Sequence, residues 1–94
     1  MADQIQVIVY HGDRAFPTVV RPDERADELL LRSVYHFGID PEEKGDFLLR
    51  HRGARRGEGN VILDHPAGDQ LRDGDLLELD RDTPDVHHIS TGHY

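Results

Sequence analysis

The segment LRDGDLLEL, Leu71–Leu79, contributes most to deciding how this chain folds. Its Asp73-Gly74 pair predicts a tight turn, because glycine adopts positive φ without steric cost and aspartate side chains stabilise turns. Leucine then alternates with acidic residues, which is the period of a strand with one buried face. We therefore predict a strand over residues 75–80, with Leu77 and Leu79 pointing into a core.

The amino-terminal part of the chain predicts a β-hairpin. Residues 4–10, QIQVIVY, alternate like a strand, and the HGD at 11–13 is a turn signal before a second strand over 14–21. Because Pro17 has no N–H to donate, we expect the second strand to lie at an edge of the sheet or to carry a bulge. The apolar face of the first strand comprises Ile5, Val7 and Val9.

A helix is predicted over residues 24–37, where apolar residues recur at steps of three and four. We expect Asp23 to cap its first turn, because an aspartate side chain accepts hydrogen bonds from the free N–H groups there. Gly38 is expected just past the last turn, in the left-handed conformation that often ends helices. The stripe facing the core would comprise Ala26, Leu29, Leu30, Ser33, Val34 and Phe37.

Two more strands are predicted between the helix and the last strand. Residues 46–51, DFLLRH, direct Phe47 and Leu49 to one side, and residues 60–64, NVILD, form a short fourth strand. A Gly- and Arg-rich loop over 52–60 joins them. The element order ββαβββ predicts an α+β fold, in which one helix packs across a sheet.

The composition fits one small domain and excludes several function classes. The chain has 94 residues and no cysteine, which leaves room for one domain and excludes disulfides and thiolate chemistry. Its net charge of −8 disfavours nucleic acid and anionic membranes as partners. No apolar run approaches the ~20 residues of a membrane span. The start, MADQIQVIVYHGD, lacks the features of a signal peptide, so we expect a cytoplasmic protein.

One basic segment departs from the acidic composition. The stretch RHRGARRGEGN, Arg50–Asn60, carries four arginines. It has no interleaved aromatic residues that could stack on bases, and it belongs to an acidic chain. We expect a solvated loop here rather than a phosphate or RNA site, and the acidic surface of a partner protein is an open alternative.

Together these elements resemble the ubiquitin-like β-grasp family. The resemblance runs from Gln4 to Asp80 and implies a ubiquitin-like β-grasp domain over residues 1–80 with a flexible carboxyl-terminal tail over 81–94. Members of this family serve as covalent modifiers, sulfur carriers, adaptors and parts of enzymes, so the fold alone does not give the function. The resemblance rests on the stretches IQVIVYHGD, VVRPDE, FGIDP, DFLLRHRG and LRDGDLLEL.

The tail favours the modifier branch, with a resemblance to bacterial ubiquitin-like proteins. That resemblance implies an E1-like activating enzyme, an E2-like conjugating enzyme that passes the glycine carboxylate to amines of target proteins, and a JAB-type metallopeptidase that trims a precursor. Ser90, Thr91 and Gly92 have the small side chains that a narrow enzyme channel requires, and residues 80–92 could extend roughly 40 Å. Gly92 is therefore the expected conjugation residue, and Gly92–His93 is the expected processing bond.

Other functions are weighed against this one. A non-covalent β-grasp adaptor would act through its sheet face or the arginine-rich loop, and its tail would be an ordinary frayed end. A sulfur carrier is disfavoured because the tail has no Gly-Gly. The sequence offers no candidate nucleophile with a neighbouring base, so we expect no enzyme activity and no cofactor. We also expect no metal site, because no carboxylate or cysteine at suitable spacing completes a ligand set with His87, His88 and His93.

Three further positions are expected at the surface. Leu48 points away from the core and, with Arg50, forms the predicted interaction surface beside the acidic Glu78 and Asp80 of the last strand. Lys44 is the only lysine, so any lysine-linked polymer of the protein would use it. We expect the remaining histidines to be solvated, namely those at positions 11, 36, 51 and 65.

Overall fold

The structure is a computed structural model that describes residues 4–54 and 58–81. In chain order the elements are β1 (Ile5–His11), β2 (Arg14–Val20), α1 (Ala26–His36), the short 3-10 helix η1 (Pro41–Asp46), β3 (Phe47–His51), the 3-10 helix η2 (Ala67–Asp69) and β4 (Asp75–Arg81). Within these two ranges, no helix is long and apolar enough to cross a membrane.

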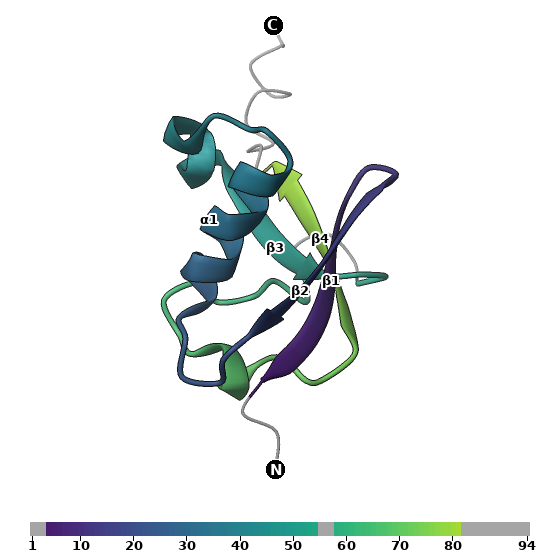
Figure 1. Cartoon of the computed structure of the whole chain (residues 1–94), viewed down its shortest axis with the longest axis vertical. Helices are drawn as coiled ribbons and strands as arrows, with labels where there is room; N and C mark the ends of the chain where they lie inside the picture. The colour runs from purple at the N-terminus through teal and green to yellow at the C-terminus, as the bar shows by residue number, and fades with distance from the viewer. Residues whose placement is uncertain (1–3, 55–57, 82–94) are drawn as a thin grey trace, which may run out of the picture.

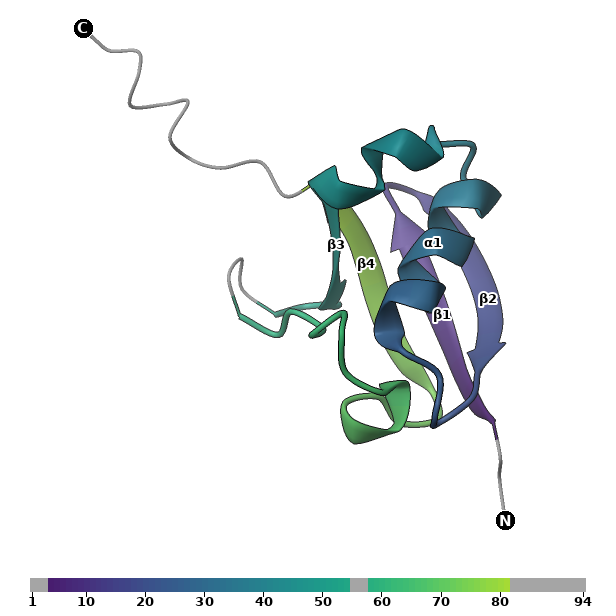
Figure 2. The ribbon, with the colours of Figure 1, turned by 90° about the vertical axis from the view of Figure 1, so that its left-hand side faces the viewer.

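The strands form one mixed sheet in the order β2-β1-β4-β3 (Figure 1). β1 is antiparallel to β2 and parallel to β4, and β4 is antiparallel to β3. α1 packs across one face of this sheet (Figure 2). The architecture confirms the predicted α+β fold, and β2 lies at an edge, as its proline predicts.

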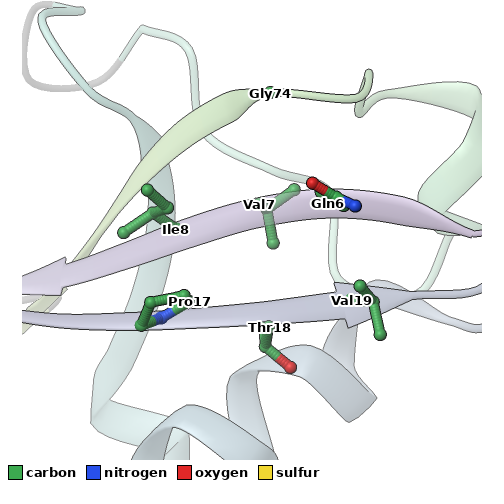
Figure 3. Close-up of a pocket in the computed structure, with 7 residues that line it drawn as sticks. All are labelled: Gln6, Val7, Ile8, Pro17, Thr18, Val19 and Gly74. Carbon is green, nitrogen blue, oxygen red and sulfur yellow. The ribbon is translucent and has the colours of Figure 1, made fainter.

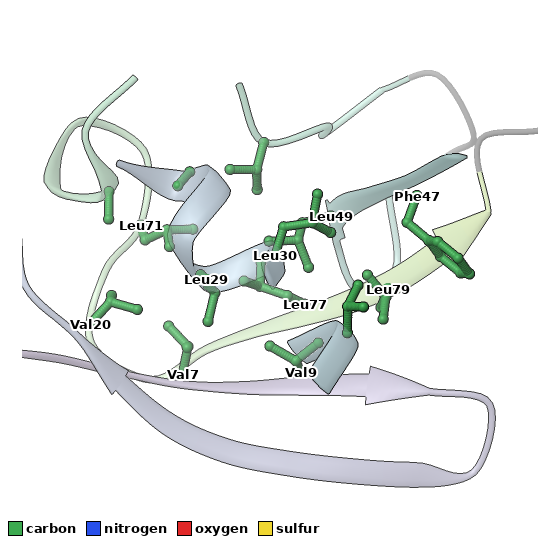
Figure 4. Packing of buried hydrophobic residues seen from close by; sticks show 14 of the residues in the cluster. Val7, Val9, Val20, Leu29, Leu30, Phe47, Leu49, Leu71, Leu77 and Leu79 are labelled. Atoms are coloured by element: carbon green, nitrogen blue, oxygen red, sulfur yellow. The ribbon is translucent and has the colours of Figure 1, made fainter. Parts of the chain in front are cut away.

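The core fills the space between α1 and the sheet (Figure 4). The alternating strands bury the residues that their period predicts, with Val9 and Leu77 fully enclosed. Ser33 is also fully buried, and its hydroxyl donates a 2.8 Å hydrogen bond to the Leu29 carbonyl, so its polar group is satisfied. The buried apolar residues are Ile5, Val7, Val9, Val20, Ala26, Leu29, Leu30, Val34, Phe37, Phe47, Leu49, Val61, Ala67, Leu71, Leu77 and Leu79.

The start of α1 differs from the prediction that Asp23 caps it. No side chain caps this helix. Instead, the amides of Ala26 and Asp27 donate to the carbonyls of His65 and Leu63 at 3.0 and 2.9 Å. The first N–H groups of a helix have no partner within the helix, so a distant loop supplies the acceptors that a capping side chain would otherwise provide.

The predicted strand over residues 60–64 is wrong. Asn60 pairs with Arg50 only through an isolated bridge. The Gln70 side chain then bonds both the N–H and the carbonyl of Ile62, at 2.6 and 2.7 Å, and holds this residue to the end of η2. The Leu63 carbonyl is already used at the start of α1. Continued pairing would place Leu63 opposite Phe47, so the carbonyl that would accept from the Phe47 amide is committed elsewhere.

The segment between α1 and β3 matches its predicted turn chemistry. Gly38 follows the helix with a φ of 75°, the conformation expected of a glycine that ends a helix. The Asp40 side chain then accepts a 3.0 Å hydrogen bond from the Glu42 amide and caps η1. This short helix carries Lys44 and leads the chain directly into β3.

Candidate functional site

The residues predicted for conjugation and processing, Ser90, Thr91, Gly92 and His93, lie outside the described residues. So do His87 and His88 of the metal alternative. The structure instead describes the domain that precedes these residues in the sequence. Within residues 4–54 and 58–81, no group of three or more His, Cys, Asp or Glu side chains is placed to hold a metal ion.

The face of the sheet opposite α1 carries side chains from alternate positions of the strands. Ile8 of β1 lies opposite Pro17 of β2 and Leu76 of β4. Two residues further along β1, Tyr10 lies opposite Glu78. The face is therefore apolar towards the start of β1 and charged towards the end of β4.

The apolar half forms a small patch, which we define as Ile8, Pro17, Val19 and Leu76. Val19 and Leu76 are 40% and 42% exposed, and they lie on the same face as Ile8 and Pro17. A shallow, open hollow of about 470 Å³ lies beside Ile8, Pro17 and Val19 and is also lined by Gln6 (Figure 3). This patch was not predicted from the sequence, although apolar residues at outward positions of three strands were a visible signal.

The charged half is built around Arg50. Its Nη2 lies 2.6 Å from Oε1 of Glu78 and 2.5 Å from Oδ2 of Asp80. Arg52 adds to the group, because its guanidinium lies 3.9 Å from the centre of the Tyr10 ring and 3.5 Å from Oε2 of Glu78. We call Arg50, Arg52, Glu78 and Asp80 the charged ladder.

This ladder changes the interpretation of the predicted interaction residues. Leu48 lies opposite Asp80, and Arg50 lies opposite Glu78, so the acidic neighbours predicted for Leu48 are confirmed. Leu48 is half-buried, and the Arg50 side chain is only 16% exposed. Arg50 and Arg52 are thus ion-paired within the domain, whereas the other arginines of the basic segment, 55 and 56, lie outside the described residues.

Both outer edges of the sheet are partly occupied. At β3, the His51 amide donates to the Gly59 carbonyl at 2.9 Å, and the Val61 amide donates to the Leu49 carbonyl at 2.8 Å. These bonds use backbone groups that an added strand would need. Edge strands otherwise present free backbone groups to other chains.

At β2, the Val19 carbonyl accepts a 2.8 Å hydrogen bond from Nη1 of Arg32, which projects from α1 and is ion-paired with Glu24. Pro17 stands two residues earlier and presents its backbone to the same side, because the direction of backbone groups alternates along a strand. Since proline has no N–H, this edge lacks a donor as well as a free acceptor. The sheet face is therefore better suited to recognition than either edge.

The end of β4 is held to η1. β4 runs through Arg81, one residue beyond the predicted strand. Nη2 of Arg81 lies 3.0 Å from Oε1 of Glu43, and Nη1 lies 3.8 Å from Oδ2 of Asp46. The guanidinium also lies 4.7 Å from the centre of the Phe47 ring. Lys44, half-buried in η1, is next in sequence to one of these partners.

The expectation that all four remaining histidines are solvated is wrong for His11. Its ring is half-buried and packs 5.3 Å from the Phe37 ring. Its Nδ1 lies 3.1 Å from the Leu79 carbonyl oxygen. Because a carbonyl can only accept, Nδ1 carries a hydrogen and donates it. His36 is exposed, but it stacks on Phe16 with ring centres 4.1 Å apart.

No protein-family profile and no curated protein matches the sequence. Among solved structures, it is similar to a designed protein based on ubiquitin, with a TM-score of 0.66 and 18% identity over 98% of this chain and 96% of that chain. It is also similar to Caldiarchaeum subterraneum ubiquitin, with a TM-score of 0.64 and 13% identity over 86% of this chain and 96% of that chain.

A third similar structure is the N-terminal ubiquitin-like domain in the 4931431F19Rik protein. The TM-score is 0.62 and the identity 9%, over 89% of this chain and 80% of that chain. These likenesses define the class of fold, and the chain has the ubiquitin-like β-grasp fold. Proteins of one fold carry out many functions, so the fold does not by itself assign an activity.

Proposed function

We propose that this chain is a ubiquitin-like protein modifier, joined to amines of target proteins through Gly92. The observation that carries the proposal is a ubiquitin-like domain whose last strand ends at Arg81 and is followed in sequence by a segment that reaches Ser90, Thr91 and Gly92. Residues 82–92 could extend about 36 Å at ~3.3 Å each, which is long enough to enter an enzyme cleft.

In this proposal the chain is a substrate of enzymes and not an enzyme itself. A JAB-type metallopeptidase cleaves the Gly92–His93 bond, and an E1-like enzyme adenylates the freed carboxylate in the cytoplasm of a bacterial cell. An E2-like enzyme then transfers the Gly92 acyl group to the amine of a target. Lys44 is the only lysine of the chain, so it would be the acceptor in any lysine-linked polymer.

The proposal is tested by looking for genes of a JAB-type peptidase and an E1-like enzyme beside the gene for this chain, and by incubating the enzymes that they encode with the protein. Peptidase treatment should remove the mass of His93 and Tyr94, and the product should form an ATP-dependent covalent adduct with the E1-like enzyme. Gly92→Val is the matched control, because a branched side chain should not pass a channel that accepts glycine. Failure of both the intact chain and a chain ending at Gly92 to react would overturn the proposal.

The second candidate function is a non-covalent adaptor, and the apolar patch favours it. Val19 and Leu76 are exposed beside Ile8 on a flat sheet face, and exposed apolar groups of this kind often bind proteins. The two candidates separate in one comparison. A chain ending at Arg81 keeps the patch and should still bind an adaptor's partner, whereas a modifier ending there cannot be conjugated.

A further inference from the structure

The last residues of β4 extend beyond the end of its pairing with β1. The β1–β4 pairing stops at Tyr10 and Glu78. β4 nevertheless continues through Arg81, where its other side pairs with Phe47 of β3. Among the described residues, the end of β4 is therefore held by backbone pairing on one side only, and a strand end held in this way is prone to fray.

Two side chains make contacts at the end of β4 that backbone pairing with β1 does not supply. His11, the residue after the last β1–β4 pair, donates from Nδ1 to the Leu79 carbonyl at 3.1 Å. Arg81 reaches Glu43 at 3.0 Å and lies over the Phe47 ring at 4.7 Å. One contact comes from the β-hairpin, and the others come from η1 and the start of β3. Both lie along a polar hollow at the end of β4 that is also lined by Asp40 and Asp80.

We propose that His11 and Arg81 are positioning residues that hold the end of β4 and so fix the point from which residues 82–92 reach an enzyme. The second part of this inference rests on the function proposed above. The effective concentration at which a linker delivers its end falls as a flexible linker becomes longer than the span it has to bridge. Fraying of residues 80 and 81 would lengthen the linker and let its direction vary, so Gly92 would find the enzyme site less often.

The holding role is tested in the full chain by backbone amide hydrogen exchange. Arg81→Gln removes the ion pairs and the contact with Phe47, and His11→Phe keeps an aromatic ring but removes the N–H. Each variant should speed exchange of residues 79–81 by about 3–10-fold, because partly exposed ion pairs and cation–π contacts shift equilibria by a few-fold each. Exchange at buried Leu77 should not change.

Arg21→Gln is the matched control, because it removes another arginine ion pair, with Asp23 at 3.3 Å, that is remote in sequence from β4. It should leave exchange at residues 79–81 unchanged. Combining Arg81→Glu with Glu43→Arg restores the ion pair in reverse and should return exchange towards the wild-type rate. Unchanged exchange in both Arg81→Gln and His11→Phe would overturn the holding role, whether or not the chain is a modifier.

The positioning role is tested by kinetics with the E1-like enzyme, using chains that end at Gly92. Arg81→Gln should raise KM about 3–10-fold and leave kcat within about twofold, and the charge-reversed pair should recover KM. A residue that only stabilised the fold would not raise KM while leaving kcat unchanged, with KM then recovered in the charge-reversed pair. Faster exchange with an unchanged KM would overturn the positioning role. If no variant and no wild-type chain reacts, the proposed function fails, and the exchange data alone decide the holding role.

Discussion

Arg50 shows how a single side chain determines the character of a binding face. Its guanidinium lies between Glu78 and Asp80 on the neighbouring strand, with a side chain only 16% exposed. An outward position on a sheet normally carries a side chain that partners can contact. Here two carboxylates already satisfy the charge, so this half of the face is closed to a partner that would need a free arginine.

The coupling between Arg50 and Glu78 should be measurable in a double-mutant cycle. We expect a coupling free energy of about 1 kcal/mol from Arg50→Ala and Glu78→Ala, because the pair is short and mostly sheltered from solvent. The pair Arg21–Asp23, whose side chains are 72% and 76% exposed, is the control and should couple by only about 0.3 kcal/mol. Urea unfolding measures both cycles, and equal coupling in the two would contradict the expectation.

Gly38 should be required by its backbone conformation alone. Its φ is 75°, and a Cβ built there meets no atom within 4 Å, so only the backbone opposes an alanine. We expect Gly38→Ala to lower the free energy of unfolding by about 1 kcal/mol. Gly45 also has open space but no positive φ, so Gly45→Ala should cost nearly nothing. Denaturant midpoints that fall equally in both variants would show that strain is not the cause.

At the scale of elements, β2 shows how an edge strand is protected from other chains. Pro17 removes a donor from the open edge, and Arg32 of α1 occupies the Val19 carbonyl at 2.8 Å. A helix and a strand that are separate in sequence therefore cooperate to block strand addition. The apolar patch lies on the face of the same strand, which directs partners to the face rather than to the edge.

Opening the edge of β2 should promote self-association. Pro17→Val with Arg32→Ala supplies the missing N–H and frees the Val19 carbonyl, so the edge becomes able to pair. Sedimentation velocity should show association that increases with concentration relative to the wild-type chain. Arg32→Ala alone, which leaves the proline in place, should associate less. If the folded double variant sediments like the wild type, the protection has another origin.

For the molecule as a whole, the first and last strands lie side by side at the centre of the sheet. The core therefore cannot close until β4 has joined β1. The buried apolar residues of the described chain run from Ile5 to Leu79, and they include Leu77 and Leu79 of β4. In a domain this small each such residue contributes a large share of the stability.

A chain that ends at Arg81 should therefore fold and unfold like the full chain. We expect its urea midpoint to imply a free energy of unfolding within about 0.5 kcal/mol of the full-length value, because the core residues named above are all retained. A chain that ends at Asp73 lacks β4 and should show no cooperative transition. If removal of residues 82–94 lowers the free energy of unfolding by well over about 0.5 kcal/mol, the domain extends past β4.

Local sequence determined those elements that depend only on residues close to one another in the chain. Alternation placed Val9 and Leu77 in the core, the three- and four-residue spacing gave α1, and Gly38 ended it, since each of these depends on side-chain periodicity or one residue's φ. The proline of β2 even gave its place at the edge. The class of fold followed from the order of these elements, and the likeness to ubiquitin structures agrees.

Only the tertiary structure decided which distant groups meet. The predicted strand over 60–64 failed because the start of α1 took the Leu63 carbonyl, and Asp23 lost the capping role to the same loop. The charged ladder and the apolar patch arise from the register of β4 between β1 and β3. That register is set by packing of the whole core, and no local pattern contains it, because its partners are dozens of residues apart. Only the resemblance to the β-grasp family placed Glu78 and Asp80 beside Leu48 in advance.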